Sequence, residues 1–412
     1  MRPNRLLVSV GLVLALAATW PRSAGAADRG DLNNDGVVTI SDAALAIKMV
    51  VGLANAGPDA LAVADVAPPP NGDGKVGLDD VIRILRFALG LIPPSDFYQN
   101  TSGQMGTFTT SLHGSGSGKI AWYSAANGGF ETISQIPYNQ LSCQNCHKPK
   151  CDNCHDTSYP KPGATVAQSK CEGCHSRQMA EAASYSDVHR DAGMKCMSCH
   201  TKREMHGDGT TYQSMLQQGA MDVSCESCHP NPPSSVSHTV HGGKVACASC
   251  HSQSVVSCYN CHFDAEVKQG QKIPYGQFKN WLLLVSRNGK VYPANFQSVE
   301  YHGKTFIAMA PFFSHTVQKQ GRQCDDCHNS PAVQQYKQSG KIDVVKWNDA
   351  TGKLEPITGV VPVIPNYQTD MRFDFAEMAA DGSWHFLKTG VDQFQLRWGE
   401  PLTADQMSKL AR

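Results

Sequence analysis

The sequence carries little charge and no excess of either sign. In 412 residues, 36 Lys and Arg oppose 36 Asp and Glu, and charged residues make up only 17% of the chain. So small and evenly mixed a charged fraction argues against intrinsic disorder and against a coiled coil. The balance also argues against binding nucleic acid or a membrane surface through a polybasic patch. Beyond the N-terminus, no apolar run reaches the roughly 18 residues that a membrane-spanning helix needs.

Cysteine is absent before Cys143, so no lipid-attachment cysteine follows the N-terminal segment. That segment has the pattern of a signal peptide. Arg2 and Arg5 precede the apolar stretch 6–18, and residues 24–26 are the small residues that signal peptidase needs. The apolar stretch is too short for a membrane helix, although an uncleaved anchor is the alternative. We expect residues 1–26 to be removed and the mature chain to be exported, to the periplasm or to the outer cell surface.

Cysteine occurs only as eight C-x-x-C pairs, each followed directly by histidine. The cysteines are Cys143, Cys146, Cys151, Cys154, Cys171, Cys174, Cys196, Cys199, Cys225, Cys228, Cys247, Cys250, Cys258, Cys261, Cys324 and Cys327. The histidines are His147, His155, His175, His200, His229, His251, His262 and His328. Such thiols can bond to the two vinyl groups of one porphyrin, with the histidine as proximal iron ligand. A zinc ribbon or a thioredoxin-like pair has no use for this histidine. We predict eight covalent haem c groups and no disulfide.

Eight histidines remain outside these motifs, which equals the number of irons. These distal-ligand candidates are His113, His189, His206, His238, His241, His302, His315 and His385. Met194 and Met221 are alternatives at individual irons. Two imidazoles on each iron leave no open coordination position and favour a low potential, which suits electron transfer.

The spacing of the motifs predicts the fold of the haem region. The linkers between successive motifs are 3, 15, 20, 24, 17, 6 and 61 residues long, so most side chains of residues 141–330 are expected to contact a porphyrin. Within the longest linker, residues 263–323, apolar runs flank an Asn288-Gly289 turn and predict a small β insertion that delivers His302 and His315 to haems.

The remaining segments complete the predicted organisation. Residues 94–140 are interpreted as a linker and the start of the haem domain, and residues 331–412 as a β-containing cap. The predicted fold class is mostly irregular and α-helical. It is a loop-rich multihaem c-type cytochrome fold with short helices, a small β insertion and a β-containing C-terminal cap, plus an N-terminal α-helical domain that is EF-hand-like.

An internal duplication precedes the haem region, because residues 31–53 and 69–91 repeat at an offset of 38. Oxygen ligands at alternate positions can wrap a hard cation such as calcium. In the first copy they are Asp31, Asn33, Asp35, the Val37 carbonyl, Thr39 and Asp42. In the second they are Asn71, Asp73, the Lys75 carbonyl and Asp80. There Pro69 occupies the first ligand position, and Asp65 can reach it only if the proline-rich insertion bulges outward.

Residues 28–93 resemble a dockerin, a pair of calcium loop–helix units. The resemblance implies one or two calcium ions and a docking partner. The alternative is a calcium-stabilised structural domain without a partner.

The eight C-x-x-C-H motifs make the haem region resemble the exported octahaem cytochromes of bacteria that respire extracellular or periplasmic acceptors. We expect an electron carrier rather than an enzyme, with redox proteins, other cytochromes or extracellular acceptors as partners. Self-assembly of several copies is a further alternative. The alternative is a multihaem oxidoreductase for nitrite, hydroxylamine or a sulfur oxyanion, with one open haem. No C-x-x-C-K motif is present, and such an enzyme would leave one spare histidine, such as His113 or His385, off the irons. A third alternative is a scaffold protein.

Overall fold

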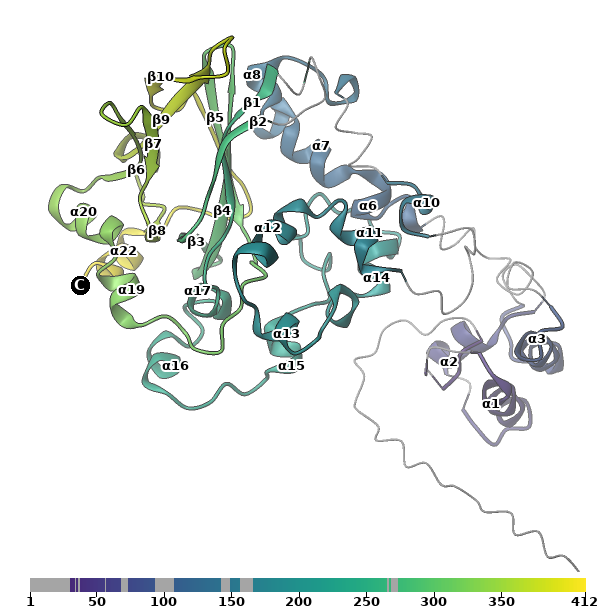
Figure 1. Cartoon of the computed structure of the whole chain (residues 1–412). Helices are drawn as coiled ribbons and strands as arrows, with labels where there is room; N and C mark the ends of the chain where they lie inside the picture. Colours follow the sequence, from purple (N-terminus) through teal and green to yellow (C-terminus); the bar gives the residue numbers. More distant parts are fainter. Residues whose placement is uncertain are drawn as a thin grey trace, which may run out of the picture. The chain divides into compact units, whose positions relative to one another are not determined.

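The computed structural model describes residues 30–33, 35, 38–55, 57–67, 73–92, 107–141, 149–155, 166–264, 267 and 273–412 (Figure 1). The chain divides into two compact units, Met1–Gln99 and Asn100–Arg412, and each is considered by itself. The predicted signal peptide lies outside the described residues. Within the described residues, no helix is both long enough and apolar enough to cross a membrane.

The N-terminal unit is a pair of equivalent helices with a shorter helix between them. The helices are α1 (Ile40–Val50), α2 (Pro58–Ala64) and α3 (Leu78–Ala88). Thr39 and Asp42 form a capping box that starts α1. Small and branched side chains of α1 and α3, among them Ala46 and Ile84, are fully buried against each other. The two halves of the duplication therefore share one small core.

Short helices joined by loops form the first part of the C-terminal unit. They are α6 (Leu112–Ser115), α7 (Ser117–Tyr123), η1 (Ala125–Asn127), α8 (Glu131–Ser134), η2 (Tyr138–Gln140), α10 (Cys151–Cys154), α11 (Gln168–Glu172), α12 (Ser176–Ser184), α13 (Val188–Asp191), η3 (Cys196–Ser198), α14 (Lys202–His206), α15 (Cys225–Cys228), α16 (Val236–His241) and α17 (Cys247–His251). The end of the predicted linker is folded, because Phe130 and Ile133 pack against Val299 and Phe306 of the sheet described next.

Two sheets form the second part. The seven-stranded sheet contains β1 (Ser257–His262), β2 (Ile273–Phe278), β3 (Trp281–Arg287), β4 (Lys290–Tyr301), β5 (Lys304–Pro311), β8 (Gly359–Pro362) and β11 (Gln393–Leu396). Its order is β11-β5-β4-β1-β2, and β3 pairs with β4 and β8. The four-stranded sheet contains β6 (Ile342–Asn348), β7 (Lys353–Pro356), β9 (Met371–Met378) and β10 (Trp384–Thr389) in the order β10-β9-β6-β7. Four helices complete the chain: α19 (Cys324–His328), α20 (Pro331–Ser339), α21 (Tyr367–Asp370) and α22 (Ala404–Leu410).

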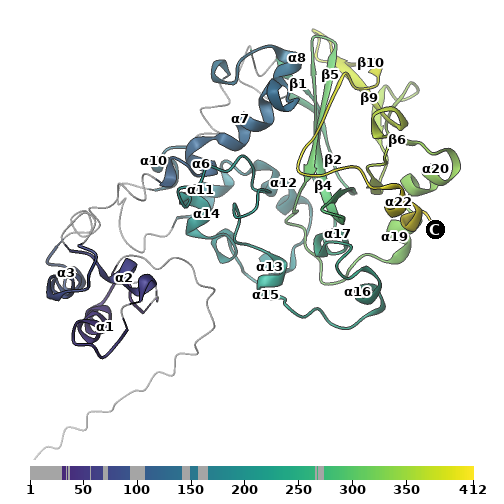
Figure 2. The ribbon, with the colours of Figure 1, turned by 180° about the vertical axis from the view of Figure 1, so that it is seen from behind.

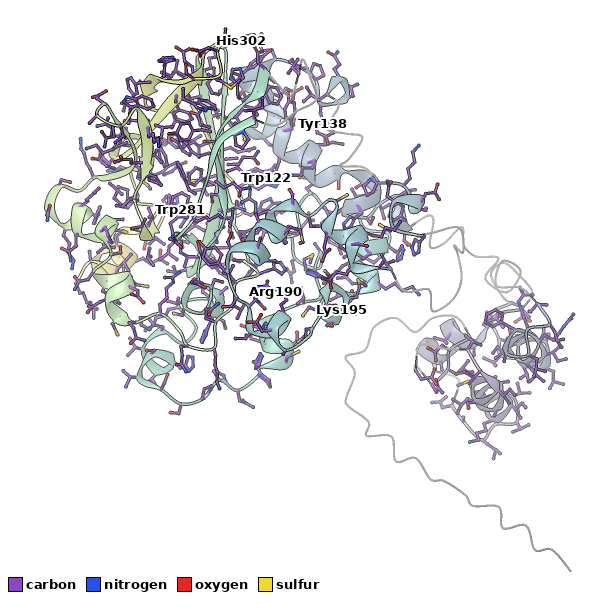
Figure 3. The ribbon with its side chains drawn as sticks, viewed as in Figure 1. Trp122, Tyr138, Arg190, Lys195, Trp281 and His302 are labelled. Atoms are coloured by element: carbon purple, nitrogen blue, oxygen red, sulfur yellow. The ribbon has the colours of Figure 1, made fainter. Side chains whose placement is uncertain are left out.

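The main hydrophobic core lies among these strands. Trp281, Phe296 and Phe373 are all nearly or fully buried in it, and they come from β3, β4 and β9. Figures 1 and 2 show the long strands β4 and β5 between the four-stranded sheet on one side and the helices from α6 to α15 on the other. Figure 3 shows Trp281 within this part of the molecule and His302 at the far end of the strands.

The predicted fold class is wrong. The hairpin at Asn288 and Gly289 is present, but it belongs to a large sheet that includes a haem motif in β1 and the strands β8 and β11 of the expected cap. The residues expected to form an insertion and a cap therefore share one core. The prediction assumed that porphyrins take the place of most of the apolar core. In the structure, neighbouring protein side chains bury the apolar residues 281–285, so the strands form a core of their own.

Replacement of Phe296 tests this core. Phe296 is completely buried, so Phe296→Ala leaves a cavity and is expected to lower the free energy of unfolding by about 3–5 kcal/mol. Phe386 is 43% exposed, and Phe386→Ala is the matched control with an expected loss below about 1 kcal/mol. Urea denaturation followed by far-UV circular dichroism measures both. Equal losses would contradict a core formed by these strands.

Candidate functional site

Most described haem motifs sit on one turn of helix. The helices α10, α15, α17 and α19 begin at the first cysteine of a motif, and η3 begins at Cys196. The histidine N–H donates to the carbonyl of the first cysteine, as from His155 to Cys151 (2.9 Å) and from His229 to Cys225 (2.9 Å). Such a turn places both thiols on one side of the backbone, as attachment to one porphyrin edge requires. Cys143, Cys146 and His147 lie outside the described residues.

The seventh motif lies instead on strand β1. Residues three apart on a regular strand face opposite sides of a sheet. Asn260 has a φ of 52°, so the backbone departs there from a regular strand, although the register with β2 is the same on both sides, with Tyr259 opposite Gly276 and Cys261 opposite Pro274. Cys258 and Cys261 are both partly buried, whereas Tyr259 and Asn260 between them are fully buried. The buried side chains anchor the strand: the Tyr259 hydroxyl donates to the Asp374 carbonyl at 2.7 Å.

Six described motif histidines each have one non-motif histidine opposite, with ring centres 6.0–6.3 Å apart. The pairs are His155 with His206, His175 with His113, His200 with His315, His229 with His189, His251 with His238, and His328 with His241. Two imidazoles bonded to one metal at about 2.0 Å each would have ring centres about 6.3 Å apart. Ordinary packing explains neither this uniform separation nor the one-to-one pairing.

Hydrogen bonds to Nδ1 orient many of these rings. The Nδ1 atoms of His238 and His241 lie 2.6 Å and 3.1 Å from the carbonyls of Pro233 and Ser237. Similar carbonyl contacts hold His206, His251 and His328, at 3.2, 3.0 and 2.9 Å. Metal-binding histidines characteristically donate one ring nitrogen to such a partner, which leaves the other nitrogen for the metal. In these rings the nitrogen that does not contact the carbonyl is Nε2.

The electrostatic environment favours neutral imidazole, the form that binds a metal. Burial, together with neighbouring imidazoles, lowers the pKa of His113, His175 and His315. The described residues contain no group of three or more His, Cys, Asp and Glu side chains arranged to hold a metal ion. A haem iron needs at most two protein ligands, because the porphyrin supplies four nitrogens. The paired histidines therefore fit a haem iron.

Two predicted distal ligands, His302 and His385, face no motif histidine among the described residues. His302 occupies the turn between β4 and β5, its ring stacks on Tyr301 at 4.0 Å, and its Nε2 lies 3.1 Å from Asp264. The Nε2 of His385 contacts the Ser383 hydroxyl at 2.9 Å. In both residues, therefore, Nε2 contacts a protein side chain.

Electrostatic interactions between thiols indicate which motifs are neighbours. The interacting pairs are Cys154 with Cys174, Cys171 with Cys196, Cys199 with Cys228, Cys225 with Cys247, and Cys250 with Cys327. Burial first, and the neighbouring thiol of Cys247 second, raise the pKa of Cys225 to about 11. Among the described motifs, these pairs link the second, third, fourth, fifth, sixth and eighth in that order.

The first calcium loop is held by its last carboxylate. Asp42 is fully buried and accepts hydrogen bonds from the backbone N–H groups of Leu32 (2.8 Å), Asn33 (3.1 Å) and Thr39 (2.7 Å). Asp31 accepts from the backbone of Asp35 at 3.1 Å. The described candidate ligands thus lie around one loop, while Val37 falls outside the described residues.

The second loop repeats these contacts with Asp65 in place of Asp31. Asp80 accepts from the backbone N–H groups of Val66 (2.6 Å) and Ala67 (2.7 Å), as Asp42 does from Leu32 and Asn33. Asp65 accepts from the backbone of Asp73 at 3.0 Å, as Asp31 does from Asp35. Alignment of the two sequence copies placed Pro69 at the first ligand position, because the proline-rich insertion shifts the second copy relative to the first. Lys75 donates its N–H to Asp73 (3.0 Å), and Asn71 lies outside the described residues.

Comparison with known proteins agrees with the N-terminal resemblance. Residues 29–89 match the family model of the dockerin type I domain. Dockerin domains bind calcium and dock onto a partner, so the match supports both properties for this unit. It also agrees with an extracytoplasmic location, which is typical of dockerin proteins. No curated protein and no solved structure matches the chain significantly.

The contacts of Asp65 predict a second calcium ion. Asp65→Ala is expected to reduce binding from two calcium ions to one, measured by isothermal titration calorimetry. The exposed Asp79 lies beside the same loop, and Asp79→Ala should leave both ions bound. At tenfold excess of calcium over Kd, each ion adds about 1.4 kcal/mol of stability. Two ions bound by Asp65→Ala would remove this residue from the site.

The histidine pairs predict which spare histidines set a redox potential. His241 faces His328, so His241→Met converts a bis-imidazole site into a Met/His site. One midpoint potential should then rise on the order of 0.1 V, within the roughly 0.8 V that axial ligands span. His385 faces no motif histidine among the described residues, so His385→Met should shift no potential. Spectroelectrochemical titration measures both variants, and a shift in His385→Met alone would refute the pairing.

Proposed function

We propose that this chain is an exported octahaem c-type cytochrome that transfers electrons along a series of closely spaced, mostly bis-histidine haems in anaerobic or extracellular respiration. The observation that carries the proposal is the set of six imidazole pairs, each joining a C-x-x-C-H histidine to a different spare histidine. When bound, haem supplies one-electron chemistry between ferric and ferrous iron. Paired imidazoles fill both axial positions, which favours electron transfer over substrate binding.

The order of the attachment sites supports a single path. Each interacting thiol pair links one described motif to the next, from the second motif at Cys154 to the eighth at Cys327. Removal of an interior member interrupts this series, whereas removal of an end member only shortens it. Within the series the eighth motif follows the sixth, and β1 carries the seventh motif into the sheet.

The protein can also set different potentials along this path. Most oriented rings donate to neutral carbonyls, but His200 Nδ1 lies 2.7 Å from the carboxylate of Glu204. Glu204 is buried, and it also accepts from the backbone N–H groups of Asp222 (2.6 Å) and Val223 (3.0 Å). A carboxylate makes the imidazole a stronger donor to the metal than a carbonyl does, which favours the ferric state. We therefore assign a lower potential to the His200 site than to its neighbours.

Each repeat of the N-terminal unit has an exposed apolar face suited to a docking partner. Apolar side chains at equivalent positions of the two repeats are exposed: Ile40 (58%) and Leu78 (66%), and Val51 (59%) and Leu89 (53%). We propose that a cohesin-like protein covers one of these faces and thereby holds the cytochrome near its redox partners. Those partners would be other cytochromes or acceptors in the periplasm or at the outer cell surface.

A haem count and spectroscopy test the proposal. The purified protein should contain eight haems by the pyridine haemochrome assay, and the paired sites should give low-spin ferric signals in low-temperature EPR. A protein without covalent haem, or with high-spin signals throughout, would refute the proposed function.

The path is tested by removing single attachment sites. The double variant Cys196→Ala/Cys199→Ala removes the fourth site, an interior member. It should lower electron transfer across the adsorbed protein, measured by single-molecule conductance, at least tenfold. The matched control Cys324→Ala/Cys327→Ala removes the terminal eighth site and should have a smaller effect. Equal effects would contradict a single ordered path.

A further inference from the structure

The seventh haem motif differs from the six paired sites in what faces its histidine. Among the described residues, no second histidine lies opposite His262. Its Nδ1 instead lies 2.9 Å from the carboxylate of Glu300, which is only 3% exposed. His262 and Glu300 are direct partners across the parallel strands β1 and β4, so the sheet itself fixes this contact. The second carboxylate oxygen of Glu300 accepts from the backbone of Gly303 at 2.9 Å.

The leftover spare histidines do not fill the position. The side chain of His302 is 64% exposed and its Nε2 is directed at Asp264, while the Nε2 of His385 is directed at Ser383. Asn260 is fully buried, and its side-chain amide donates to the Ala376 carbonyl at 2.7 Å. The motif therefore cannot slide along the strand to meet either histidine without breaking the core.

The charge next to the motif favours a negative ligand. Arg177 donates to the Val256 carbonyl at 3.2 Å, and its guanidinium lies 5.4 Å from the centre of the Phe312 ring. The same guanidinium interacts electrostatically with the thiols of Cys258 and Cys261, and the buried carboxylate of Glu181 offsets part of its charge. A partly buried cation close to the attachment cysteines attracts a small anion more strongly than a neutral ligand.

We propose that the haem attached through Cys258 and Cys261 has His262 as its only protein axial ligand and binds a small inorganic anion at its sixth position. This inference rests on the proposed haem loading of the chain. The carboxylate of Glu300 strengthens donation from His262 and stabilises ferric iron, the oxidation state that binds anions.

Cyanide titration of the ferric protein tests the proposal without any substitution. One high-spin haem is expected in low-temperature EPR, and cyanide should convert it to low spin at one equivalent per molecule. The double variant Cys258→Ala/Cys261→Ala should lose this signal. The matched control Cys324→Ala/Cys327→Ala should keep it, because that control removes a paired site.

Each other outcome is decisive. Eight haems with no high-spin signal and no response to cyanide would overturn this inference but leave the electron-transfer function intact. A high-spin signal that survives Cys258→Ala/Cys261→Ala would place the open position at another iron and also overturn it. Absence of covalent haem would refute the proposed function itself.

A matched pair of substitutions tests the role of the carboxylate. Glu300→Gln should shift the iron–histidine resonance Raman band of the ferrous high-spin haem to lower wavenumber. Glu204→Gln changes the same kind of contact at the paired site of His200, and should leave this band unchanged. An unchanged band in Glu300→Gln would overturn the assignment of His262 as the ligand of the open haem.

The preference for an anion is tested at Arg177. Arg177→Gln should weaken cyanide binding to ferric protein at least fivefold, while carbon monoxide binding to ferrous protein should stay within twofold of the original. An equal loss for both ligands would show that the substitution disturbs the site as a whole. The anion preference would then be overturned.

Discussion

The separation between paired imidazoles is the constraint on which the C-terminal unit depends. A motif histidine completes a bis-imidazole site only if a second imidazole stands about 6 Å away. The chain meets this need with histidines from distant segments, as when His315, beyond β5, faces His200. Short helices suit the task, since one turn presents a motif and one backbone carbonyl can orient each ring.

A second constraint, burial of apolar side chains, builds the other part of this unit. The two sheets bury Trp281, Phe296 and Phe373 among protein side chains. The two parts meet at β1, where one strand both joins the sheet and carries the seventh motif. The only described motif carried by a strand is thus also the only one whose histidine meets a carboxylate across a sheet rather than an imidazole.

The N-terminal unit follows a different principle, because its loops are organised around carboxylates. Asp42 and Asp80 each collect backbone N–H groups from the start of their loops, and Asp31 and Asp65 complete the arrangement. These contacts bring the oxygen ligands together and leave apolar residues of both repeats exposed on the helices. A module of this kind can hold a partner while the C-terminal unit exchanges electrons. Docking and redox chemistry therefore need not share a surface.

The sequence by itself predicted the attachment chemistry, because C-x-x-C-H is a local pattern that can be read without the fold. It also indicated the duplicated loops and the turn at Asn288. Only the tertiary structure decided which histidines meet, because pairing depends on long-range packing that no spacing encodes. It likewise decided that His302 turns toward Asp264, that Asp65 replaces Pro69, and that the expected insertion and cap form one sheet. The physical reason is that local chemistry depends on residues adjacent in the sequence, whereas burial and strand pairing bring together residues that are far apart in the sequence.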